Sequence, residues 1–78
     1  KQKKSKINSF SGEIFLSVII PAYNEEKRIS QTLLAIDHYL SAQPYSYEIL
    51  VVNDGSTDRT AQIVKNFQKL IKNLKLID

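Results

Sequence analysis

Several residue types that build common functional sites are missing from this sequence or scarce in it. Among its 78 residues there is no cysteine, which excludes disulfides and thiolate metal sites. The single histidine, His38, cannot by itself form a histidine-rich zinc site. Two glycines are too few for a Walker A loop or a dinucleotide-binding fingerprint. No apolar run approaches the ~20 residues that cross a bilayer, so we expect no transmembrane segment in this chain.

Positive charge is concentrated near the N-terminus. The net charge is +3, and Lys1, Lys3, Lys4 and Lys6 supply all of the basic excess, because residues 7–78 hold seven basic and eight acidic side chains. We therefore predict that residues 1–15 form a flexible basic leader. Such a leader could contact anionic lipid or nucleic acid, but no aromatic residue lies between its lysines. A solubilising role is the simpler interpretation, and we expect no nucleic-acid partner.

The first half of the remaining chain is predicted to form a strand followed by a helix. The apolar run at residues 15–20 is typical of a buried strand, and Pro21, which cannot donate to a sheet ladder, is expected to end it. A helix is predicted over residues 25–42, with Asn24 as its N-cap and two glutamates in its first turn. The apolar stripe of this helix has spacings of four, three and four residues and consists of Ile29, Leu33, Ile36 and Leu40.

The second half repeats this order and sets the fold class. Residues 48–53 are typical of a buried parallel strand, residues 58–73 of a second amphipathic helix, and residues 74–77 of the start of a third strand. The β-α-β-α-β order predicts a Rossmann-like α/β fold with a parallel sheet and right-handed crossovers. Because two helices can hardly cover three strands on both faces, we expect residues 16–78 to be the N-terminal portion of a larger domain. The predicted apolar face of the second helix comprises Ile63, Val64, Phe67, Leu70 and Ile71.

Two polar clusters follow the first two predicted strands, at residues 21–26 and 53–58. Since the carboxyl ends of parallel strands meet at one edge of a sheet, both clusters are expected to line one pocket. Helix N-termini there would attract phosphate, carboxylates would accept bonds from ribose or a base, and a tyrosine ring would stack on a base. An acidic rim facing a diphosphate usually also needs a divalent cation. The chemistry indicates a sugar nucleotide or a related phosphate ligand. The expected lining residues are Tyr23, Asn24, Glu25, Asp54 and Ser56.

The same residues resemble a known family. Residues 17–26 read Ser-Val-Ile-Ile-Pro-Ala-Tyr-Asn-Glu-Glu, and residues 51–58 read Val-Val-Asn-Asp-Gly-Ser-Thr-Asp. These two motifs resemble the opening of family 2 glycosyltransferases of the GT-A type. The surrounding residues are most similar to the polyprenyl-phosphate branch, especially dolichyl-phosphate glucosyltransferases.

The resemblance implies a role for particular residues. One turn would line the uridine or guanosine pocket, an acidic residue after the second strand would bind the base or ribose, and two neighbours would shape the turn. The chain departs from the usual pattern at Asn53, where an aspartate is common. The Asp-x-Asp metal motif and the catalytic base are absent, so no catalytic or metal-binding residue is expected within this chain. The implied nucleotide-binding residues are Pro21, Tyr23 and Glu25 in the first turn, Asp54 as the acidic residue, and Val52 and Gly55 beside it.

The implied function is transfer of a hexose, expected to be glucose, from a nucleotide sugar to a polyprenyl or dolichyl phosphate, as in protein glycosylation. UDP-glucose is the expected donor and GDP-mannose the alternative, with Mg²⁺ or Mn²⁺ bound in the complete enzyme. The expected location is the cytoplasm or the cytoplasmic face of a membrane. We expect this isolated chain to show weak or no turnover, because half of the site is missing.

Two plainer interpretations stay open on the sequence alone. Asp54 and Gly55 are also what any strand-to-helix turn uses, and the two glutamates are common helix-starting charges. The chain could likewise be a small α/β module for binding or oligomerisation without catalysis. In that case the open sheet edge at the third strand could pair with a second copy or with a missing domain.

Overall fold

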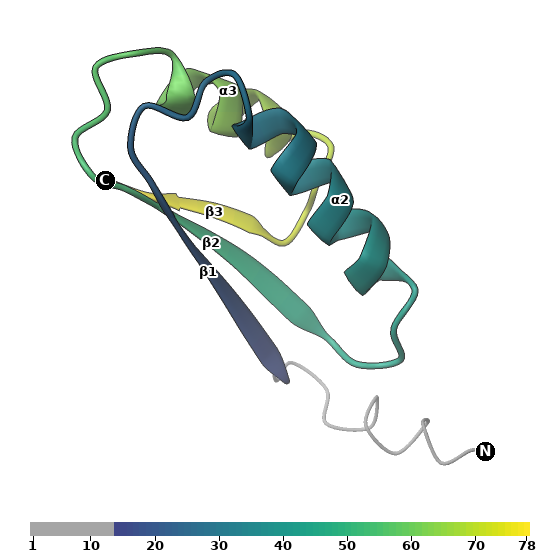
Figure 1. Cartoon of the computed structure of the whole chain (residues 1–78). Helices are drawn as coiled ribbons and strands as arrows, with labels where there is room; N and C mark the ends of the chain where they lie inside the picture. The colour runs from purple at the N-terminus through teal and green to yellow at the C-terminus, as the bar shows by residue number, and fades with distance from the viewer. Residues whose placement is uncertain (1–13) are drawn as a thin grey trace.

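The structure, a computed structural model, describes residues 14–78, so most of the predicted leader lies outside the described residues. The chain forms a three-stranded sheet in the order β1-β2-β3, and both neighbouring pairs are parallel. This confirms the predicted α/β class, the β-α-β-α-β order of elements and the parallel sheet. The elements are β1 Leu16–Ala22, α2 Ile29–Ser41, β2 Tyr47–Asn53, α3 Thr60–Phe67 and β3 Leu74–Ile77 (Figure 1).

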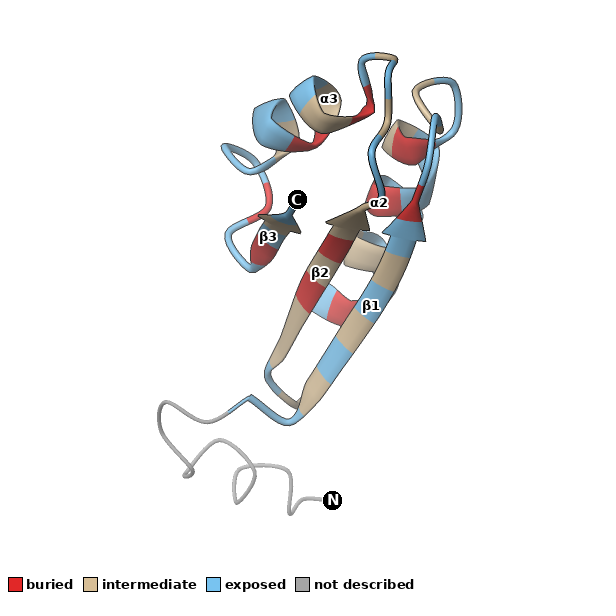
Figure 2. Ribbon diagram, turned by 90° about the vertical axis from the view of Figure 1, so that its left-hand side faces the viewer, coloured by how far each residue is buried: buried red, intermediate tan, exposed pale blue. Residues whose placement is uncertain are grey.

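Both helices lie on the same face of the sheet (Figure 1). The strands follow one another in spatial order, so two crossovers of the same hand carry α2 and α3 over the same side. In Figure 2, α2 lies behind β1 and β2, and the opposite face of these strands is turned toward the viewer. Among residues 14–78, no helix covers that second face.

Because both helices lie on one face of the sheet, the first strand is less buried than predicted. Along β1 the side chains alternate, with Val18 and Ile20 half-buried and Ile19 63% exposed on the open face. The prediction of a buried run was therefore wrong for every second residue. Pro21 does not end the strand either, since it lies inside β1 opposite Val52. Among residues 14–78 no strand pairs with the other side of β1, so the N–H that proline lacks leaves no described partner strand without a hydrogen bond.

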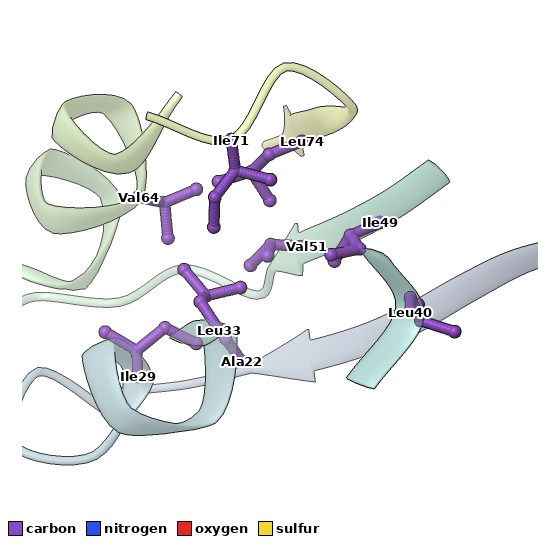
Figure 3. Packing of buried hydrophobic residues seen from close by; sticks show 9 residues of the cluster. All are labelled: Ala22, Ile29, Leu33, Leu40, Ile49, Val51, Val64, Ile71 and Leu74. Carbon is purple, nitrogen blue, oxygen red and sulfur yellow. The ribbon is translucent and has the colours of Figure 1, made fainter. Parts of the chain in front are cut away.

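The core lies between the sheet and the two helices. Leu33 of α2, Val51 of β2 and Val64 of α3 are fully buried, and burying each such side chain contributes about 1.5–3 kcal/mol. Side chains from both helices and all three strands converge in this layer (Figure 3). The buried apolar residues are Ala22, Ile29, Leu33, Leu40, Ile49, Val51, Val64, Ile71 and Leu74.

The first helix begins later than predicted. It starts at Ile29 rather than at residue 25, and residues 26–28 form a turn in which the carbonyl of Glu25 accepts bonds from the amides of Arg28 and Ile29. Asn24 is not the N-cap of α2. Its backbone has a φ of 52°, in the left-handed region, and its side chain bonds to the other loop instead. That long-range bond removes the only predicted cap from the helix.

The second helix is shorter than predicted at both ends. It runs from Thr60 to Phe67, and residues 68–70 form a turn rather than a further helical turn. Leu70, predicted on the apolar face, is 74% exposed, whereas Ile71 is buried. The chain has to turn back here because Leu74 pairs with Ile49 in β2. Within residues 14–78, neither helix has the length and apolar character needed to cross a bilayer.

Candidate functional site

Two loops leave the sheet at its carboxyl edge, one after β1 at residues 23–28 and one after β2 at residues 54–59. The pairing of β1 with β2 runs to the last residue of each strand, Ala22 opposite Asn53. The amide of Asp54 then donates to the carbonyl of Ala22 at 2.9 Å. The structure thus brings the two predicted clusters together at one edge of the sheet.

Asn24 joins the first loop to the second. Its side-chain oxygen accepts hydrogen bonds from the amides of Thr57, at 2.8 Å, and Asp58, at 3.3 Å. The amide of Asn24 in turn donates to the hydroxyl of Ser56 at 2.9 Å. The left-handed backbone of Asn24 suits this role, since asparagine is one of the few residues besides glycine that adopts it readily.

Asp58 and Thr60 form the second connection. Thr60 is fully buried, and its hydroxyl oxygen accepts from the amide of Glu25 at 2.8 Å while donating to Oδ1 of Asp58. Asp58 also accepts from the amide of Thr60 at 2.9 Å and, through Oδ2, from the amide of Glu26 at 3.2 Å. Partial burial acts to raise the pKa of the Asp58 carboxyl, but the bonds from Thr60 and Glu26 together hold that pKa below its ordinary value.

These bonds use the backbone amides that were expected to bind phosphate. In the first loop, the amides of residues 24–26 donate to the side chains of Ser56, Thr60 and Asp58. In the second loop, the amides of residues 56–60 donate to Asn53, Asn24, Glu26 and Asp58. An amide that already donates to a side chain within the protein offers less to a phosphate. The predicted phosphate site at the two helix N-termini is therefore not formed by these amides.

Some of the predicted nucleotide-binding residues are exposed in the loops, and others lie on neighbouring strands. Tyr23 is 58% exposed, and both Asp54 and Gly55 are exposed at the tip of the second loop. Gly55 has a φ of 74°, a conformation in which other residues are strained. On the strands, Pro21 and Val52 are neighbours in register on the open face of the sheet.

Glu25 is the predicted residue whose side chain is most engaged. Its Oε1 accepts from Nε and Nη2 of Arg28 at 3.0 and 2.6 Å, and the Arg28 side chain is 75% exposed. Both residues border two open hollows at the mouth of the loops. One, of about 260 Å³, is also lined by Ile20, Pro21, Ile29 and Thr32, and the other, of about 430 Å³, by Asn24, Glu26, Lys27 and Asp58.

Sequence reasoning missed the roles of Arg28, Asp58 and Thr60. The spacing of Arg28 from Glu25 is that of an ion pair on one side of a helical turn, and this signal was available. Nothing in the local pattern identified Thr60, because its partner Glu25 lies 35 positions away.

Asn53, which departs from the usual family pattern, has a defined partner. Its side-chain nitrogen donates to Oδ1 of Asp78 at 2.7 Å, and its side-chain oxygen accepts from the amide of Ser56 at 3.2 Å. An ionised aspartate at position 53 accepts bonds only and could not donate to Asp78. The asparagine therefore fits its surroundings in this chain.

The acidic side chains here do not make a divalent-cation site. Within residues 14–78, no group of three or more histidine, cysteine, aspartate or glutamate side chains is placed to hold a metal. The oxygens of Asp58 already accept bonds from Thr60 and Glu26, and Oε1 of Glu25 accepts from Arg28. The described residues thus do not fit Mg²⁺ or Mn²⁺.

Comparison with known proteins places the chain in a family. The family described as Glycosyl transferase family 2 matches residues 17–78. In Trichomonas vaginalis, the dolichyl-phosphate beta-glucosyltransferases ALG5A and ALG5D are 39% and 41% identical over 70 and 71 residues, covering 83% and 85% of this chain. This chain spans 22% of the length of each of these two relatives. It belongs to glycosyltransferase family 2.

Solved structures support the same assignment. Staphylococcus aureus TarS, in a crystal structure of residues 1–349, superposes with a TM-score of 0.61 and 40% identity, covering 80% of this chain and 18% of TarS. A second crystal structure holds TarS in complex with UDP, with the same similarity. The β-α-β-α-β unit described above is thus part of a GT-A nucleotide-binding fold.

Proposed function

We propose that this chain recognises the nucleoside part of a sugar nucleotide at the carboxyl edge of its sheet. The proposal is carried by the two loops that the structure holds side by side, in a chain 40% identical to a protein crystallised with UDP. Ligands of open α/β sheets bind past the carboxyl ends of the strands, where these loops lie.

Three exposed groups supply the recognition chemistry. The ring of Tyr23 stands at the surface and is free to stack on a base. The carboxylate of Asp54 is positioned to accept bonds from a base N–H or from ribose hydroxyls. Gly55 lets the backbone approach the ligand, since no side chain projects there and an added Cβ would meet open space. Glu25, Pro21 and Val52 complete the proposed site.

The dolichyl-phosphate beta-glucosyltransferases among the relatives support a proposal for the sugar and its acceptor. We propose that an enzyme of the relatives' length transfers a hexose to a polyprenyl phosphate such as dolichyl phosphate, at the cytoplasmic face of a membrane. UDP-glucose is the proposed donor and GDP-mannose the alternative. A divalent cation, Mg²⁺ or Mn²⁺, is proposed for that enzyme but not for the residues described here.

Titration of the ¹⁵N-labelled chain with UDP, UDP-glucose, GDP and GDP-mannose tests the proposal. We expect chemical-shift changes at Tyr23, Asp54 and Gly55, larger for the uridine nucleotides, with and without Mg²⁺. Asp54→Asn and Tyr23→Ala should weaken binding about tenfold each, the loss of one hydrogen bond to a charged group or one stacking contact. Tyr39→Ala is the matched control, because Tyr39 is equally exposed but lies on α2. Equal effects at Tyr23 and Tyr39 would contradict the proposal.

A second candidate is a non-catalytic α/β module that associates with its own copies. The observation in its favour is that β3 pairs on one side only among the described strands, which leaves one row of its backbone groups open for another strand. Light scattering after size-exclusion chromatography distinguishes the two. A nucleotide-binding monomer supports the first candidate, whereas a dimer without nucleotide affinity supports the second.

A further inference from the structure

Each loop both donates hydrogen bonds to the other and accepts hydrogen bonds from it. The side chains of Tyr23 and Asp54 take no part in these bonds. Thr60, the first residue of α3, accepts a hydrogen bond from the amide of Glu25, and Asp58, in the second loop, accepts one from the amide of Glu26. A hydrogen bond also runs from the second loop to the first, because Oε1 of Glu26 accepts from the amide of Arg59 at 2.9 Å. Neither loop therefore has its conformation set by its own residues alone.

Thr60 is the buried centre of this arrangement. Its side chain is fully buried, unlike that of any other polar residue among residues 14–78, and both functions of its hydroxyl are used. The hydroxyl oxygen accepts a hydrogen bond from the amide of Glu25, and the O–H donates one to Asp58. The carboxylate of Asp58 therefore fixes the direction of the hydroxyl. Tyr23 lies two residues before Glu25 in the first loop, and Gly55 lies three residues before Asp58 in the second loop. The hydrogen bonds of Thr60 and Asp58 connect these two loops.

We propose that Asp58 and Thr60 are positioning residues, which hold the first loop, with Tyr23, and the second loop, with Asp54, at the spacing that a nucleotide requires. The inference rests on the proposed nucleotide-binding function. A ligand that must contact both loops binds only the fraction of molecules in which both loops have the binding-competent conformation. Its apparent affinity falls in proportion to that fraction. Asp58 and Thr60 thereby control affinity without contacting the ligand.

The two residues differ in what a substitution removes. Thr60→Val keeps the shape but removes both hydrogen-bonding functions, so the amide of Glu25 loses its acceptor. Thr60→Ser keeps the hydroxyl. Asp58→Asn replaces two acceptor oxygens by one, so the amides of Glu26 and Thr60 can no longer both be satisfied as before.

The test measures UDP affinity of the 78-residue chain and its variants by NMR titration, with heteronuclear NOE values for each amide. We expect Thr60→Val and Asp58→Asn to weaken UDP binding about tenfold, as when a tenth of the molecules remain competent. Thr60→Ser should stay within about twofold of the original chain. The NOE values at Tyr23 and Gly55 should fall in free Thr60→Val and recover at saturating UDP, while those of β2 stay unchanged.

The controls separate this inference from the function on which it rests. Asp37→Asn is the matched substitution, because Asp37 also accepts a side-chain hydrogen bond, from Tyr47 at 2.9 Å, but at the opposite end of the strands. If Thr60→Val fails to fold, Asp58→Asn and Thr60→Ser carry the test. Folded Asp58→Asn and Thr60→Val chains with the original UDP affinity overturn the inference and leave the proposed function intact. An unsubstituted chain that ignores UDP overturns both.

Discussion

The side-chain oxygen of Asn24 lies 2.8 Å from the amide nitrogen of Thr57, 33 positions further along the chain. This contact replaces the local helix cap that asparagine commonly provides and connects the two loops at the carboxyl edge of the sheet. Its consequence is that the geometry of the candidate site depends on pairs of residues far apart in the sequence.

Asn24 should contribute measurably to stability through both its backbone and its side chain. Asn24→Ala forces alanine into the left-handed region and removes the acceptor for Thr57. We expect a loss of about 2–3 kcal/mol in the free energy of unfolding, measured by urea denaturation. Asn24→Gly adopts the left-handed backbone without strain and loses only the bonds from the amides of Thr57 and Asp58, so a loss of about 1–2 kcal/mol is expected. An alanine variant as stable as the glycine variant would contradict this account.

Asn53 and Asp78 allow a test of the departure from the family pattern. Asn53→Asp would place two carboxylates where a 2.7 Å hydrogen bond now lies. We expect a loss of up to about 1 kcal/mol near neutral pH, because the pair is exposed and water screens the repulsion. Adding Asp78→Asn should restore the stability, since the donor and acceptor are then exchanged. If the double variant is no more stable than Asn53→Asp alone, the pairing does not exist in solution.

The core gives a prediction with an adjacent control. Leu33 is fully buried between α2 and the sheet, whereas Leu34 is 51% exposed on the same helix. Leu33→Ala should lower the free energy of unfolding by about 2–5 kcal/mol, because the cavity it leaves cannot fully collapse. Leu34→Ala should cost less than about 1 kcal/mol. Similar losses for the two variants would place α2 in a different rotation about its axis.

The acid stability of the fold should depend on Asp58. Its pKa is lower in the folded chain than its ordinary value, so the unfolded chain binds a proton more readily. The stabilisation from the ionised carboxylate is therefore present above the ordinary aspartate pKa and is lost as pH falls through the lower folded value. Urea denaturation from neutral pH down to about pH 3 should show a shallower acid loss in Asp58→Asn. An unchanged acid slope would mean that Asp58 is not hydrogen-bonded as described.

Much of the architecture was predictable because it depends on local patterns. The apolar runs located β2 and β3, and the order of elements predicted a parallel sheet with both polar clusters at one edge. Helix ends were less predictable. Leu70 fits the apolar period of α3, but the chain leaves the helix at Phe67 so that β3 can reach β2. Periodicity does not record where a chain must turn.

The candidate site was predictable in position and only partly in chemistry. Tyr23 and Asp54 lie exposed at the predicted edge, as a ligand-contacting role requires. The expected phosphate-binding amides are instead satisfied by side chains of the opposite loop, Thr60 and Asp58 among them. A single sequence shows which residues are able to bond, but not which of two suitable partners, more than thirty positions apart, they choose.

In the proposed site, the exposed ring of Tyr23 stacks on the base of a uridine nucleotide. Intermolecular NOEs between the protons of the uracil ring and the tyrosine rings of the UDP-saturated chain test it most directly. The account predicts NOEs to Tyr23 and none to Tyr39, and it predicts that Asp54→Asn reduces them at equal UDP concentration. Saturable binding with NOEs to Tyr39 or Tyr45 instead of Tyr23 would contradict it.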